Sequence, residues 1–77
     1  MKFKTSDPVV LNKDMPEFGL KQGDLGAVVQ VYEPDGLEVE FVTAAGKTEA
    51  LLTLHQDDVR HVGDSDLMAV RSLRRTA

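Results

Sequence analysis

The chain has 77 residues, no cysteine and a formal net charge of −4. A chain of this length forms one small domain, which buries only about 60% of the surface that the unfolded chain exposes. The absence of cysteine excludes disulfide bonds and thiolate metal sites, and the acidic charge argues against a domain that grips a nucleic-acid backbone. Because the sequence has neither a secretory signal nor an apolar run of about 20 residues, we expect a cytoplasmic protein that makes no membrane contact.

Strand patterns dominate the chain. The sequence predicts strands at residues 8–12, 26–32, 37–41, 48–54 and 59–62, because these runs are rich in β-branched residues or alternate between two faces. Between them lie an irregular loop at 12–24, turns at 34–36 and 44–47, and a single 3₁₀ turn at 55–58. This is the chain order of a small SH3-like barrel of about five strands. We therefore predict an all-β fold in a single domain, residues 1–77, with the barrel core at 8–62.

The C-terminal extension, residues 63–77, has an ambiguous pattern. Ser65 fits the N-cap of a helix that carries Leu67, Val70 and Leu73 on one face. Residues 67–73 also fit an additional strand with alternating faces. Of the two, we favour the strand.

The glycines of the stretch GDLG, residues 23–26, fit turn chemistry better than phosphate-binding chemistry. A dinucleotide fingerprint needs a strand before its glycines and a helix after them, and a P-loop needs Gly-Lys followed by Ser or Thr; neither pattern occurs. We predict that Gly23 and Asp24 form a turn and that Gly26 lies where a side chain would clash. Three more glycines are predicted at structural turns: Gly19, Gly36 and Gly46.

Two resemblances to known families follow from these residues. The stretch GDLGAVV, residues 23–29, resembles the opening of KOW-type SH3-like modules in ribosomal and transcription factors. The stretches VVLNKDMPEFGLKQGDLGAVVQVYE, LEVEFVTAAGKTEALLTL and DDVRHV resemble a family of small bacterial domains of unknown function, number 4926 in its series, over roughly residues 8–73. One departure is Met15, where we expect leucine. This resemblance implies an SH3-like barrel and a stand-alone bacterial protein, and it supplies no catalytic residues.

Candidate catalytic and metal-binding residues are few. His55 and His61, even with Asp57 and Asp58, match no zinc spacing and offer no thiolate or third imidazole. The pair Glu38 and Glu40 shares one strand face, but nothing in the sequence marks an apolar pocket that would raise a pKa there. We expect a protein that is not an enzyme and that holds no cofactor or metal.

Some strands place apolar residues on both faces. If Val29 and Leu52 face the core, then Val28 and Leu51 face outward and need cover. Either residues 67–73 or a second copy of the chain would supply this cover.

Two functions from different classes fit the sequence. The first is a protein-interaction module, accessory, antitoxin-like or immunity-like, in which the loop and the outer strand acids bind a basic partner. Its candidate partner-binding residues are Glu17, Phe18, Lys21, Glu38, Glu40 and Glu49. The partner is either a different protein or a second copy of the chain in a homodimer. The second is a KOW-type nucleic-acid-binding module that uses the 23–26 turn with the cations Lys13, Lys21, Arg71, Arg74 and Arg75. The net charge and the scarcity of aromatic side chains oppose this second function.

Overall fold

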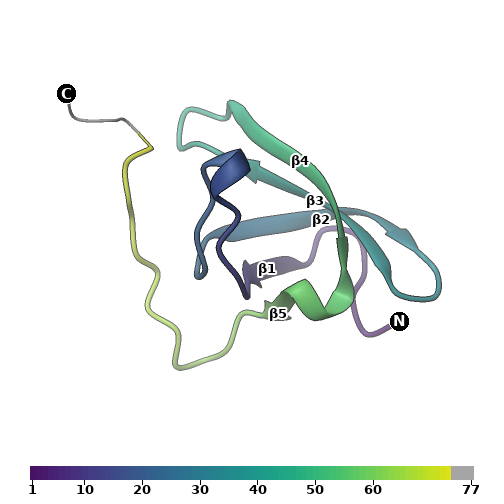
Figure 1. Cartoon of the computed structure of the whole chain (residues 1–77). Coiled ribbons are helices and arrows are strands. Elements are labelled where there is room, and N and C mark those ends of the chain that lie inside the picture. Colours follow the sequence, from purple (N-terminus) through teal and green to yellow (C-terminus); the bar gives the residue numbers. More distant parts are fainter. Residues whose placement is uncertain (74–77) are drawn as a thin grey trace.

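The computed structural model describes residues 1–73, and the strands within this range form one antiparallel sheet (Figure 1). Within these residues the strands are β1 (Pro8–Leu11), β2 (Leu25–Tyr32), β3 (Gly36–Val42), β4 (Thr48–His55) and β5 (Val59–His61). Two short 3₁₀ helices, η1 (Pro16–Phe18) and η2 (Gln56–Asp58), lie in the loop before β2 and in the turn before β5. The sheet order is β4-β3-β2-β1-β5, which is consistent with a small barrel. The predicted all-β class, the five strands and the 3₁₀ turn before the last strand are confirmed.

One face of the sheet forms the core. In β3, Leu37, Val39 and Phe41 are buried, as their period-two spacing predicts. Phe3 joins this core from the segment before β1, where its ring packs on His61 with the ring centroids 4.3 Å apart. The sequence pattern did not assign Phe3 to the core. The full cluster of buried residues is Phe3, Val9, Leu11, Leu20, Val28, Leu37, Val39, Phe41, Leu54 and Val59.

The glycines of the 23–26 stretch have the structural roles that the sequence predicts. Gly23 has a φ of +96°, a conformation that L-residues with side chains rarely adopt. At Gly26 in β2, an added Cβ would lie only 2.8 Å from Cγ1 of Val39, so the two strands approach too closely for a side chain. Gly36 differs from the other predicted turn glycines, because it begins β3 and has no positive φ. There an added Cβ would lie 3.2 Å from Cβ of Tyr32.

The β2 side chains that point into the core are not those considered from the sequence. Val28 is fully buried opposite Val39, and Val29 faces outward. The register between β2 and β3 shifts between Val28 and Gln30, and this irregularity changes which residues of β2 face the core. Leu51 does face outward, with 53% of its surface exposed, while Leu52 packs against the core. Val28 therefore needs no cover, and the predicted Val28–Leu51 outer patch does not exist.

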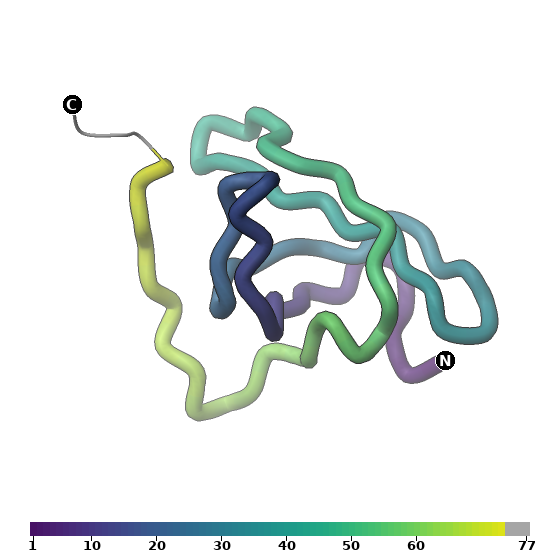
Figure 2. Tube along the Cα trace, viewed as in Figure 1, coloured from purple at the N-terminus to yellow at the C-terminus, as the bar shows by residue number. Residues whose placement is uncertain are grey.

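Residues 62–73 contain neither a strand nor a helix. Over this range, both predicted forms of the extension are therefore wrong. Leu67, Met68 and Val70 are all exposed, so no alternating buried face fixes a strand register here. Figures 1 and 2 show the extension, in yellow-green and yellow, running along the side of the domain beside the loop at 12–24. Arg74 and Arg75, which belong to the predicted extension, lie outside the described residues. Across residues 1–73, no helix has both the length and the apolar character that crossing a membrane requires.

Candidate functional site

The outer face of β3 and β4 carries a compact group of fixed acidic side chains. Glu38 lies opposite Thr53 in the sheet, and Glu40 lies opposite the exposed Leu51. The Thr53 hydroxyl donates to Oε1 of Glu38 at 2.6 Å, and the Thr48 hydroxyl donates to Oε2 of Glu40 at 2.6 Å. We call these five residues the acidic patch.

The acidic patch combines oriented charge with apolar surface. A hydroxyl donor on each carboxylate restricts its rotamers, so less conformational entropy is lost when a partner cation binds. Leu51 lies directly across from Glu40 on the neighbouring strand and is more than half exposed. Such a surface fits a ligand that presents a lysine or arginine next to an apolar side chain.

The remaining predicted partner-binding residues do not all join the acidic patch. Glu17 and Phe18 form part of η1 and are exposed, and Lys21 is exposed farther along the same loop. Glu49, on β4, lies instead at the edge of a groove, which it lines together with Leu20 of the loop.

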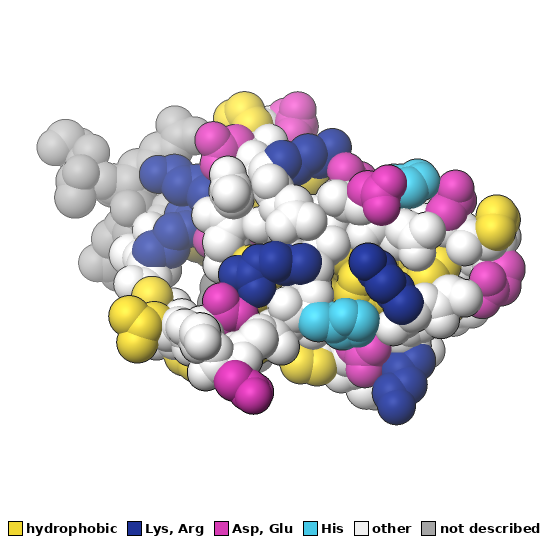
Figure 3. Space-filling view, turned by 90° about the horizontal axis from the view of Figure 1, so that it is seen from below, with side chains coloured by type: hydrophobic (Ala, Val, Ile, Leu, Met, Phe, Trp, Pro, Cys, Tyr) yellow, Lys and Arg dark blue, Asp and Glu magenta, His cyan; other side chains and the backbone are white. Residues whose placement is uncertain are grey.

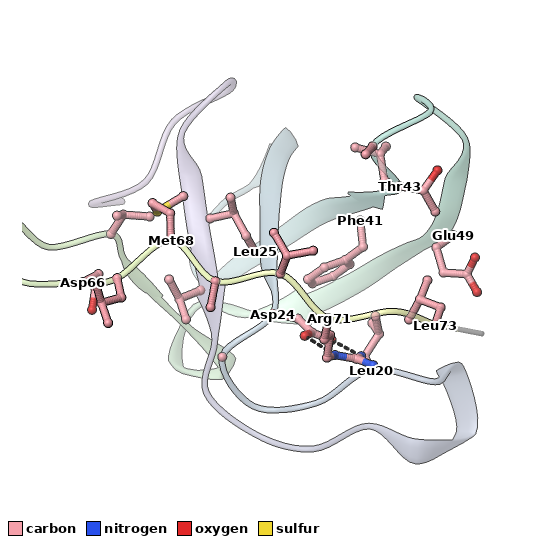
Figure 4. A pocket seen from close by; sticks show the side chains of 18 of the residues that line it. Leu20, Asp24, Leu25, Phe41, Thr43, Glu49, Asp66, Met68, Arg71 and Leu73 are labelled. Atoms are coloured by element: carbon pink, nitrogen blue, oxygen red, sulfur yellow. Dashed lines mark hydrogen bonds and ion pairs between the residues drawn. The ribbon is translucent and has the colours of Figure 1, made fainter. Parts of the chain in front are cut away.

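A groove of about 810 Å³ is bounded by the extension, by outward residues of the sheet, and by Leu20 and Phe41 at the edge of the core (Figure 4). Its floor includes Val10 of β1, whose cross-strand neighbours are Arg60 on β5 and Leu25 on β2. Val10 is only 7% exposed, yet it does not belong to the core cluster, so it is covered from the outer side. We call this the extension groove. Residues 67–73 line this groove together with Val10 and Leu25, and neither Val28 nor Leu51 lines it, so the predicted cover of Val28 and Leu51 is wrong.

Two bidentate ion pairs hold the extension in place. Arg71 donates from Nε and Nη2 to the two carboxylate oxygens of Asp24 at 2.8 and 2.6 Å, and from Nη2 to the Gly19 carbonyl at 2.9 Å. Arg60 donates to both oxygens of Asp66 at 2.8 and 3.0 Å. The hydrogen bonds from Arg71 hold the pKa of Asp24 below its usual value. Those from Arg60, with the backbone N–H of Gly63, lower the pKa of Asp66 to about 2.

A local hydrogen bond orients the Asp24 carboxylate that pairs with Arg71. Its Oδ2 accepts the backbone N–H of Lys21 at 2.8 Å, and this short-range hydrogen bond orients the carboxylate in the turn before β2. The sequence assigned Asp24 only to a turn. The ion pair was missed because Asp24 and Arg71 lie 47 residues apart and no pattern connects them.

The two histidines have structural partners. His55 accepts the Asp57 backbone N–H on Nδ1 at 3.0 Å, and Asp58 accepts the His55 backbone N–H in return, which caps η2. His61 packs on Phe3. Within residues 1–73, no group of three or more His, Asp or Glu side chains is arranged to hold a metal ion.

A comparison with known protein families found a match. The family model described as Domain of unknown function (DUF4926) matches residues 6–61. The chain belongs to this family. The membership that the sequence resemblance implied is therefore confirmed, but the matched region ends with β5 and does not reach residue 73, as the resemblance had suggested. No curated protein and no solved structure matches the chain.

Proposed function

We propose that this DUF4926 protein is a non-catalytic protein-interaction module that binds a basic partner protein through the acidic patch. The observation that carries the proposal is the pair of carboxylates, Glu38 and Glu40, each held by a threonine hydroxyl beside the exposed Leu51. We further propose a bacterial, cytoplasmic setting in which the domain is an accessory, antitoxin-like or immunity-like protein.

The energetics favour recognition by charge together with a small apolar contact. Complementary charges mainly speed encounter and select partners, whereas apolar contact lowers the rate of dissociation. The acidic patch supplies both, because Leu51 lies next to Glu40 across the β3–β4 pair. No buried carboxylate has to be desolvated, since Glu38 and Glu40 both lie partly in solvent.

The KOW-type nucleic-acid function has less support. Of its proposed cations, Lys13 already pairs with Asp58 at 3.2 Å, and Arg71 pairs with Asp24. On the face shown in Figure 3, Lys and Arg side chains alternate with Asp and Glu rather than forming a continuous basic stripe. A phosphate backbone needs several free cations in a row for counterion release.

The test is a pull-down from the native host with and without nuclease, at low and moderate salt. The bait proteins are the wild type, the double variant Glu38→Gln/Glu40→Gln, and a control, Glu33→Gln/Asp64→Asn, which removes the same charge elsewhere on the surface. Glutamine retains an oxygen that accepts the threonine hydroxyl, so the patch variant should keep its fold.

We expect one stoichiometric protein that survives nuclease, is captured by the wild type and the control, and is lost with the patch variant. Capture that disappears on nuclease treatment would favour the nucleic-acid function instead. Equal capture by the patch variant and the control would contradict the assignment of the acidic patch. An empty pull-down by a bait that elutes as a homodimer would point to self-association.

A further inference from the structure

The extension fills its groove poorly. Leu67 and Val70 are 92% and 98% exposed, although the two ion pairs hold the segment between them against the domain. Beneath them, Leu25 on the groove floor also stays exposed. Apolar surface therefore remains in water on both the extension and the floor, where burying it would be favourable.

The strongest contacts of the extension are polar. Arg71 makes three hydrogen bonds at the groove, two to Asp24 and one to the Gly19 carbonyl (Figure 4). Figure 4 shows this arginine reaching from the extension to Asp24, close to Leu20. The loop itself positions the acceptor for this arginine, because the Lys21 backbone N–H donates a hydrogen bond to the Asp24 carboxylate.

We propose that the extension groove is a peptide-binding site for an extended, arginine-containing apolar segment of a partner protein, and that residues 66–73 occupy it as a built-in competitor. The partner places its arginine on Asp24 and Gly19, where Arg71 now lies. It gains over the extension by directing apolar side chains toward the exposed Leu25. Binding of the partner releases the extension.

The family boundary supports this division into a site and a competitor. The matched region, residues 6–61, contains the floor residues Val10 and Leu25 and the acceptors Asp24 and Gly19. The competitor begins after that region ends. The floor and the arginine acceptors thus belong to the shared domain, and the segment that covers them does not. This site is separate from the acidic patch, so failure of either proposal leaves the other standing.

The test uses the full chain, labelled with ¹⁵N, and a synthetic peptide of residues 64–73, DSDLMAVRSL, added in trans. The protein variants are Arg71→Gln, Arg71→Gln/Asp24→Asn, and Lys13→Gln, which breaks an ion pair outside the groove. A tethered segment competes at an effective concentration of roughly millimolar, so the wild type should bind the peptide weakly. Amide shifts of Asp24 and Leu25 report binding, and the spectrum verifies the fold of each variant.

We expect Arg71→Gln to bind the peptide at least about 10-fold more tightly than the wild type or Lys13→Gln, because its competitor has lost the charge-assisted hydrogen bonds. Adding Asp24→Asn, or replacing the peptide's arginine with glutamine, should reverse the gain. Equal binding by Arg71→Gln and the wild type, or binding that ignores the arginine, would overturn the proposal. A concentration-dependent dimer that the peptide dissociates would also overturn it, since the occupant would then be a second copy of the chain.

Discussion

Substitution of Gly26 by alanine tests the close packing of β2 against β3. A Cβ at this position would lie 2.8 Å from Cγ1 of Val39, 2.9 Å from Cε1 of Phe41 and 3.1 Å from the Glu40 carbonyl oxygen. Val39 and Phe41 are buried core residues, and the third contact is backbone. None of these atoms can move aside without disturbing the β2–β3 pairing or the core.

The expected cost follows from two opposing effects. Inserting an extra group into a well-packed core costs about 1–3 kcal/mol. Replacing glycine by alanine also restricts the unfolded chain, which returns about 0.4–1 kcal/mol. The midpoints of these two ranges leave a net loss of about 1 kcal/mol of unfolding free energy, and their extremes leave about 0 to 2.6 kcal/mol. In a domain of this size, each kcal/mol lowers Tm by about 4–8 °C.

Urea denaturation followed by far-UV circular dichroism measures this loss. The control is Gly63→Ala, where φ is not positive and the nearest atom to an added Cβ is Oδ2 of Asp66 at 3.6 Å. This control should be neutral or stabilised by up to about 1 kcal/mol. If Gly26→Ala proves as stable as Gly63→Ala, the close approach of β2 to β3 described above is wrong.

Three further predictions concern the core, the η2 cap and the extension. Leu37→Ala should cost about 2–5 kcal/mol of unfolding free energy, because the Leu37 side chain is fully buried. The control Leu51→Ala should stay within about 0.5 kcal/mol of the wild type, because Leu51 is exposed. Similar losses for the two variants in urea denaturation would refute the assigned faces. Asp58→Ala removes the acceptor of the His55 backbone N–H at 3.0 Å and should cost about 1 kcal/mol, whereas the exposed Asp57→Ala should cost less in the same assay. The pKa of Asp66 is lowered from 3.8 to about 2, so its ion pair with Arg60 remains at pH 3.8 and is lost as the pH falls through a midpoint of about 2. An NMR titration of the Gly63 amide, which donates to this carboxylate, should show that midpoint, and a midpoint near 3.8 would contradict the pair.

Much of the fold could be predicted from local pattern. The alternation of Leu37, Val39 and Phe41 placed the core face of β3 correctly, because side chains in a strand point to opposite faces in turn. The clash expected at Gly26 is also present. Phe3 is different, since it lies in no periodic run and only the fold brings it against His61.

The candidate site was predicted only in part. Glu38 and Glu40 were correctly placed on one outer face, but their threonine donors depend on the pairing of β3 with β4. Glu17, Phe18 and Lys21 were assigned to the same partner-binding surface from the long loop, and they lie in the loop before β2, outside the acidic patch. The groove at Asp24 was not predicted, because its two sides come from distant parts of the chain.

Local pattern was sufficient to predict the all-β class, the strand positions and the turns at Gly19, Gly23 and Gly46, since period-two burial and backbone conformation are local properties. The buried face of β2 and the position of the extension depend instead on long-range contacts. The first depends on a register shift against β3 at Val28, and the second on an ion pair between Arg71 and Asp24. Both are contacts between residues distant in sequence, and their energies exist only after the chain has folded.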